Sequence, residues 1–152
     1  MKIIFLDIDG VLNCHQTFRN KKSTYEYNEL DDIDPENVKH LNKILSETNA
    51  NIVISSSWRL HKNIHELKFL AEQVNVDPLR IIDKTPDLSK VSYERGYEIQ
   101  KWLDGHKDIE KFVILDDDED MLHLKKFLIK TSSSTGGLTE EKANDAIKLL
   151  NS

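Results

Sequence analysis

The sequence contains a single cysteine, Cys14, among its 152 residues. One cysteine excludes an internal disulfide framework and a cysteine-rich zinc site. The chain also lacks any apolar run near the roughly 18 residues that a membrane span needs. Residues 1–7 turn acidic too early for a secretory signal, whose apolar core needs about 7–15 residues. From these absences we expect a cytoplasmic protein that does not enter a membrane.

The chain also has fewer basic residues than acidic residues. The 21 lysines and arginines are outnumbered by 27 aspartates and glutamates, which gives a formal net charge of −6. This balance argues against a surface that coats nucleic acid broadly, although it allows the protein to bind one phosphorylated end. The apolar residues occur in periodic blocks, which argues against disorder. The length fits one folded domain spanning residues 1–152.

Short, continuous apolar runs indicate strands that are buried on both faces. They lie at residues 2–6, 52–54, 81–82, 112–115 and 127–129. We expect amphipathic helices after Asp34, over residues 60–71, between Ser92 and Gly105, and after Thr139. Strands that alternate with helices predict an α/β fold, here a three-layer Rossmann-like domain around a mainly parallel five-stranded sheet.

Polar side chains follow three of these apolar runs directly. Asp7 and Asp9 follow the first run, Ser55 follows the second, and the acidic residues 116–120 follow the fourth. Open parallel sheets bind ligands beyond the carboxyl ends of their strands. Each feature alone has an ordinary explanation, because such residues often cap turns and helices. Together they predict a cleft whose carboxylates need a hard divalent cation, and oxygen-only ligands suit magnesium.

Three of these segments resemble motifs of the haloacid dehalogenase (HAD) superfamily. Residues 3–12, IIFLDIDGVL, resemble the first motif, an apolar strand followed by Asp-x-Asp-Gly-(Val/Thr)-Leu. Residues 52–55 resemble the second motif, an apolar strand ending in serine or threonine, and residues 112–117 resemble the fourth, a strand ending in an acidic pair. Arg95 stands where the basic third motif is expected, and Lys90 is its rival. The resemblance covers nearly the whole chain and implies a HAD-like fold.

Further segments resemble a compact HAD subgroup whose members occur beside or within RNA-repair proteins. They are Ser55-Ser56-Ser57-Trp58-Arg59, the helix start at Arg95-Gly96, Leu115-Asp116-Asp117-Asp118 and Thr135-Gly136-Gly137-Leu138-Thr139.

The resemblance implies a magnesium-dependent phosphomonoesterase that works through an aspartyl-phosphate intermediate. Asp7 would be the nucleophile, and Asp9 would protonate the leaving oxygen and later accept a proton from water. Mg²⁺ would be held by Asp7, the backbone carbonyl of Asp9, and Asp116 with Asp117, while Asp120 is an alternative second ligand from the acidic run.

The same resemblance assigns the phosphate contacts. Ser55 and Arg95 would hold the non-bridging phosphoryl oxygens, with Arg95 supplying charge that matches the transition state. Ser56 and Arg59 are further candidates. The alternative for Arg59 is a surface arginine on the first turn of a helix, which is equally common.

The sequence leaves little room for a cap over this site. Residues 14–32 read as a polar surface loop that is too short to fold by itself, so we expect a capless protein or a minimal cap. At most, the loop bearing Arg19, Lys21 and Lys22 would cover the cleft. An open cleft suits a phosphate on a large molecule, so the expected substrate is a phosphorylated nucleic-acid end or a nucleotide.

Two other classes of function remain open. A phospho-accepting regulatory domain would also use an α/β sheet, magnesium and an acidic pair, but its acceptor aspartate follows a later strand than the acidic pair. Here the Asp-x-Asp segment closes the first strand, which favours the phosphatase. A catalytically silent HAD fold that acts as a binding module is disfavoured because no residue of the first motif is missing.

Overall fold

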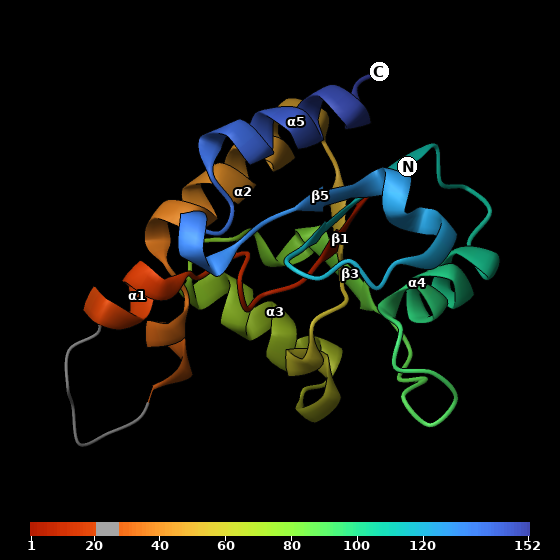
Figure 1. The fold of residues 1–152 in the computed structure, drawn as a ribbon, viewed down its shortest axis with the longest axis horizontal. Coiled ribbons are helices and arrows are strands. Elements are labelled where there is room, and N and C mark those ends of the chain that lie inside the picture. The colour runs from red at the N-terminus through yellow and green to blue at the C-terminus, as the bar shows by residue number, and fades with distance from the viewer. Residues whose placement is uncertain (21–27) are drawn as a thin grey trace.

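The computed structural model describes residues 1–20 and 28–152, and its centre is a five-stranded sheet with the strand order β3-β2-β1-β4-β5 (Figure 1). The strands are β1 (Lys2–Leu6), β2 (Asn51–Ile54), β3 (Ile81–Lys84), β4 (Lys111–Asp116) and β5 (Leu128–Lys130). Every neighbouring pair is parallel. The five expected strands are therefore confirmed, in a sheet that is wholly parallel.

The helices cover both faces of this sheet. The α-helices are α1 (His15–Asn20), α2 (Pro35–Thr48), α3 (Ile64–Gln73), α4 (Arg95–Asp104) and α5 (Glu140–Leu150). Short 3₁₀ helices are η1 (Glu29–Asp32), η2 (Ser57–His61), η3 (Pro78–Arg80), η4 (Leu122–Phe127) and η5 (Ser133–Thr135). Figure 1 shows α2 and α5 side by side, with α4 on the other side of the sheet. None of the helices in the described ranges is long and apolar enough to cross a membrane.

Alternate residues of β1 point into two separate cores. Ile4 and Leu6 pack in one cluster with apolar residues of α2, α3 and α5. Ile3 and Phe5 pack in a second cluster that includes Ile99 and other residues of α4 and η4. A strand buried on both faces needs apolar residues at every position, which explains the unbroken apolar run that the sequence shows.

The register of the sheet brings the polar strand ends together. Leu6 of β1 is paired with Ile54 of β2 on one side and with Leu115 of β4 on the other. The ladder continues one step further, because the Asp7 N–H donates to the Leu115 carbonyl at 3.0 Å and the Ser55 N–H donates to the Leu6 carbonyl at 2.9 Å. Asp7 therefore lies at the end of the central strand, between the strand ends that carry Ser55 and Asp116.

Two helix starts bear on the predictions. Asp34 caps α2 through a hydrogen bond from the Glu36 N–H, and proline occupies the first turn, as predicted. In contrast, α4 begins at Arg95 and its N-cap is Glu94, so the helix starts later than Ser92 suggested. This later start places Arg95 in the first turn, at the edge of the sheet where the polar strand ends gather.

The prediction that residues 14–32 form a surface loop is wrong for much of that segment. Residues 15–20 form α1 and residues 29–32 form η1. Thr17 is buried and its hydroxyl donates to Asp34 at 2.7 Å, while the Cys14 N–H donates to the Thr17 hydroxyl at 3.0 Å. Lys21 and Lys22, two of the three residues expected on a covering loop, lie outside the described residues.

Candidate active site

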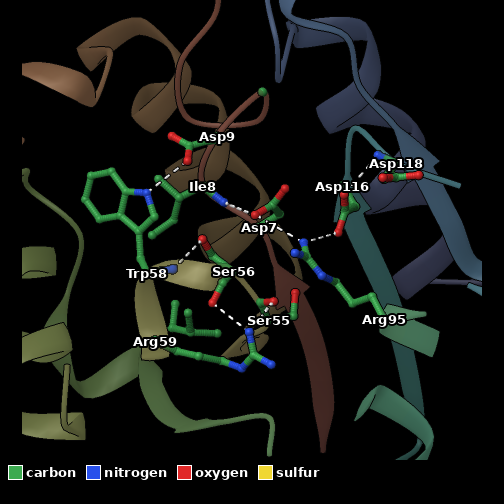
Figure 2. A network of polar contacts seen from close by, with 12 residues as sticks. Asp7, Ile8, Asp9, Ser55, Ser56, Trp58, Arg59, Arg95, Asp116 and Asp118 are labelled. Atoms are coloured by element: carbon green, nitrogen blue, oxygen red, sulfur yellow. Dashed lines mark hydrogen bonds and ion pairs between the residues drawn. The ribbon is translucent and has the colours of Figure 1, made fainter. Parts of the chain in front are cut away.

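The centre of the site is an ion-pair network at the ends of β1 and β4. The Nη1 atom of Arg95 lies 2.6 Å from Oδ2 of Asp116 and 3.2 Å from Oδ1 of Asp7 (Figure 2). Both carboxylates are buried, Asp116 completely. One guanidinium thus bridges two carboxylates that come from neighbouring strands.

Burial dominates the electrostatics of these carboxylates. Burial is the largest cause of the raised pKa of Asp7; Asp116 adds to the shift and Arg95 opposes it, and the pKa rises to about 8 overall. The pKa of Asp116 is raised as well, chiefly by burial, again with Arg95 opposing. Burial lowers the pKa of Arg95, but the two carboxylates outweigh it and raise the value overall. If both carboxyls were ionised, Arg95 would neutralise only one of their two charges.

The acidic groups meet the requirements of a magnesium site. Asp7, Asp116 and Asp117 each offer a carboxylate oxygen, and these oxygens lie within 4.8 Å of one another. Gly10 makes the approach of Asp117 possible: its φ is +80°, and a Cβ there would lie 2.6 Å from the Asp117 carboxyl carbon. A set made only of carboxylate oxygens fits a hard cation, so the residues present suit Mg²⁺. The contribution of the Asp9 carbonyl stays a prediction.

Asp120, the alternative metal ligand, lies at the start of α4. Its Oδ2 accepts the Arg95 N–H at 3.0 Å, and its backbone carbonyl accepts the Gly96 N–H at 2.9 Å. Gly96 is required at this contact, because a Cβ there would lie 2.5 Å from the Met121 carbonyl carbon. Asp120 therefore holds the first turn of α4 in place. The structure groups Asp116 and Asp117, rather than Asp120, with Asp7.

Arg95 occupies the place of the basic residue, as the third-motif resemblance suggested. It sits in the first turn of α4 and reaches both buried carboxylates. Lys90, its rival, is exposed in the segment before α4.

The two serines after β2 differ in their surroundings. Ser55 is completely buried, and its hydroxyl oxygen has no hydrogen-bond partner within the described parts of the chain. A buried hydroxyl without a partner is costly, and a phosphoryl oxygen would satisfy it. Ser56 is also buried, but its hydroxyl already accepts the Trp58 N–H at 3.2 Å and caps η2. The geometry favours Ser55 as the ligand.

Arg59 does not have the surroundings expected of a phosphate ligand. It is 4% exposed, and its guanidinium makes five hydrogen bonds, as many as it has N–H groups. Four go to the carbonyls of Ser55, Ser56, Thr85 and Pro86, and the fifth goes to Glu98 at 2.6 Å. We therefore revise its role: Arg59 joins the ends of β2 and β3 to α4.

Asp9 lies in the turn that follows β1 and is held at both oxygens. The side-chain amide of Asn13 donates to Oδ1 at 3.0 Å, and the indole N–H of Trp58 donates to Oδ2 at 3.1 Å. Asn13 also accepts the Gly10 N–H at 2.8 Å and donates to the Asp32 carbonyl at 2.8 Å. Hydrogen bonds to Trp58 of η2 and to Asp32 of η1 therefore hold the turn after β1 in place.

The segment after β5 closes against the same turn. The Thr131 hydroxyl donates to the Gly10 carbonyl at 2.6 Å, and Asn37 of α2 donates to the carbonyls of Val11 and Gly136. Gly137 has a φ of +66°, and a Cβ there would lie 2.6 Å from the Asn37 amide nitrogen. Gly137 thus allows the chain to pack closely against the Asp-x-Asp turn.

The comparison with protein families agrees with this geometry. Residues 3–143 match the family described as the HAD domain in Swiss Army Knife RNA repair proteins. The chain belongs to this family, which confirms the HAD-like α/β fold and indicates a phosphatase-type hydrolase. No significant match was found among curated proteins or among solved structures.

Sequence reasoning missed several residues that support the site. Trp58 is assigned no role of its own from the sequence, whereas the structure shows that its indole N–H donates to Asp9. Asn13 and Asn37 fix the Asp-x-Asp turn, and Glu98 binds Arg59. The available signal was position: Asn13 closes the first motif, and Glu98 lies one helical turn after Arg95.

We expect Glu98→Gln to lower the free energy of unfolding by roughly 3 kcal/mol. The change removes the charge that compensates the buried guanidinium of Arg59, and breaking one side of a buried ion pair costs about this much. Urea denaturation measures the difference. Glu110→Gln is the matched control, because Glu110 forms an ion pair on the surface with the N-terminus, and it should leave the unfolding midpoint nearly unchanged. Equal effects of both changes would contradict the assignment of Arg59.

The raised pKa of Asp7 predicts a pH-dependent stability in the presence of a chelator. A carboxyl with a pKa near 8 when folded and 3.8 as its ordinary value stabilises the fold below about pH 4 and loses that contribution as the pH rises to about 8. Asp7→Asn imitates the neutral form. Its stability relative to the wild type should rise by up to ~1.4 kcal/mol per pH unit between these limits, then level off.

Thermal unfolding of both proteins from pH 5 to pH 9 checks this. Added Mg²⁺ should stabilise the wild type more than Asp7→Asn at pH 8. A stability difference that does not change with pH would show that Asp7 is ionised throughout.

Proposed function

We propose that the protein is a magnesium-dependent phosphomonoesterase that works through an aspartyl-phosphate on Asp7. The observation that carries this proposal is the grouping of Asp7, Arg95 and the carboxylates suited to a metal, at strand ends next to Ser55, whose buried hydroxyl has no hydrogen-bond partner among the described residues. A nucleophile, a cationic phosphate ligand, a neutral phosphate ligand and an oxygen-rich cation site then lie at one edge of the sheet. Membership in a phosphatase-type family supports the same conclusion.

Asp7 supplies the nucleophile in this mechanism. A carboxylate oxygen of Asp7 attacks the phosphorus atom, a P–O bond forms, and the bond to the leaving oxygen breaks. Attack requires the ionised carboxylate, yet burial raises the pKa of Asp7 to about 8. When bound by Asp7, Asp116 and Asp117, Mg²⁺ would supply the positive charge that favours the ionised form and neutralises the phosphoryl group.

Asp9 transfers the protons. Its carboxyl group gives a proton to the leaving oxygen, and the resulting carboxylate takes a proton from the water that attacks the phosphorus of the intermediate. Inorganic phosphate leaves and Asp7 is restored, so the proton balance closes on one residue. The hydrogen bonds from Asn13 and Trp58 fix the orientation of this carboxyl group.

Ser55 and Arg95 hold the transferred group. The Ser55 hydroxyl would donate to a non-bridging oxygen and gain the partner that it lacks. Arg95 would exchange part of its pairing with Asp7 for a phosphoryl oxygen, supplying charge where it develops in the transition state. Positioning and charge neutralisation carry most of the catalysis in phosphoryl transfer.

We further propose a phosphorylated nucleic-acid end or a nucleotide as the substrate. The family description, a HAD domain in RNA repair proteins, supports this class. An open site also supports it. Residues 85–94 between β3 and α4 contain neither helix nor strand, and the described part of the β1–α2 connection has only the short helices α1 and η1. With a net charge of −6, binding should be local, with a shallow dependence on salt.

The test is magnesium-dependent phosphate release from a 3′-phosphorylated RNA oligonucleotide, a mononucleotide and an aryl phosphate. We expect preferential release from the oligonucleotide and at least a thousand-fold loss of kcat in Asp7→Asn, on the order of the loss of a covalent nucleophile. Turnover of the aryl phosphate alone would contradict the proposed substrate class, and turnover of the mononucleotide without the oligonucleotide would restrict that class to nucleotides. A fully active Asp7→Asn would contradict the nucleophile. No turnover of any ester would favour a regulatory or silent HAD domain.

A further inference from the structure

Trp58 stands beside the group to which we assign proton transfer. It belongs to η2, the turn that follows the second-motif strand, and it is partly buried against the core. Its indole N–H points at Oδ2 of Asp9, 3.1 Å away (Figure 2). The contact joins residues 49 positions apart in the sequence, so it depends on the folded arrangement of β1 and β2.

Trp58 is itself held both at its backbone and at its ring. The Trp58 backbone N–H donates to the Ser56 hydroxyl at 3.2 Å, which caps η2. The Lys62 ammonium lies 5.8 Å from the centre of the indole ring, and Lys62 is tied to Glu29 by an ion pair of 2.9 Å. An indole fixed in this way offers its N–H in one direction at little cost in side-chain entropy.

Asp9 needs such a support because its own side chain is exposed in a turn. A free aspartate rotates about the bond to its carboxyl group over a broad range. Asn13 and Trp58 each bind a different carboxyl oxygen, which together restrict that rotation. Proton transfer is efficient only when the acid lies within hydrogen-bond reach of the reacting oxygen.

We infer that Trp58 is a positioning residue that orients the Asp9 carboxyl group toward the leaving oxygen of the substrate. This inference rests on the proposed function and adds a residue to it. Trp58 acts through Asp9, so its contribution is largest where the leaving group needs a proton most. An alkyl ester has a poor leaving group, whereas a nitrophenyl ester has a leaving group that departs without protonation.

The test compares kcat/KM of Trp58→Phe with wild type on an alkyl phosphate and on p-nitrophenyl phosphate. This ratio reports the steps up to formation of the aspartyl-phosphate, so it isolates protonation of the leaving group from later hydrolysis. Phenylalanine keeps an aromatic ring and removes the N–H donor. We expect a loss of about ten-fold on the alkyl ester, from one hydrogen bond to the acid, and less than about two-fold on the aryl ester.

Trp102→Phe is the matched control. The Trp102 indole N–H also donates to an aspartate, Asp83, at 2.7 Å, but it belongs to the core under α4. Trp102→Phe should lower the stability of the protein, but kcat/KM on the alkyl ester relative to kcat/KM on the aryl ester should stay unchanged.

A double-mutant cycle separates positioning from direct contact with substrate. If Trp58 acts only through Asp9, Trp58→Phe should have no further effect on the alkyl ester in an Asp9→Asn background. A further loss there, or equal losses on both esters in the single variant, would overturn the inference while the wild-type turnover still supports the proposed function. The alkyl ester used is the 3′-phosphorylated RNA oligonucleotide, so absence of wild-type turnover on both esters would overturn the proposed function, and the inference with it.

Discussion

The contact of Arg95 with Asp7 and Asp116 is the interaction on which the rest of the site depends. Two buried carboxylates on adjacent strands repel each other, and desolvation disfavours their charges further. A single guanidinium, 2.6 Å and 3.2 Å away, offsets part of that cost. A cation bound by Asp7, Asp116 and Asp117, as we propose, would offset the rest.

Holding Arg95 in place requires most of the loops at this edge of the sheet. Its helix begins against Asp120 and Met121, where Gly96 permits the close approach. One turn later Glu98 binds Arg59, whose other hydrogen bonds fix the ends of β2 and β3. The proposed phosphate ligands Ser55 and Arg95 are therefore coupled through one buried ion pair, that of Arg59 with Glu98. Arg59 thus supports the site, and none of its N–H groups is left to bind a substrate.

The strands and the central acidic residues could be predicted because they depend on local sequence. An unbroken apolar run that ends in Asp-x-Asp-Gly specifies both a strand buried on two faces and carboxylates at its end. Residues that depend on distant partners could not be predicted. Arg59 looks like an exposed arginine until Glu98, 39 positions later, is folded against it. Asn37 meets Gly136 across 99 positions, and α1, with six residues, is too short to show an apolar repeat.

In the proposed mechanism, Asp7 becomes phosphorylated and the resulting aspartyl-phosphate is then hydrolysed. The most direct measurement is acid quenching of the protein during turnover, followed by mass spectrometry of the peptide that carries Asp7. We expect a phosphoryl adduct on Asp7 that forms and decays at rates compatible with kcat. With p-nitrophenyl phosphate the adduct should accumulate in Asp9→Asn, because this leaving group departs without a proton whereas hydrolysis lacks its proton acceptor. An adduct on another residue, or turnover with no adduct in either protein, would contradict it. An adduct in the wild type that persists without phosphate release would instead indicate a phospho-accepting regulatory domain.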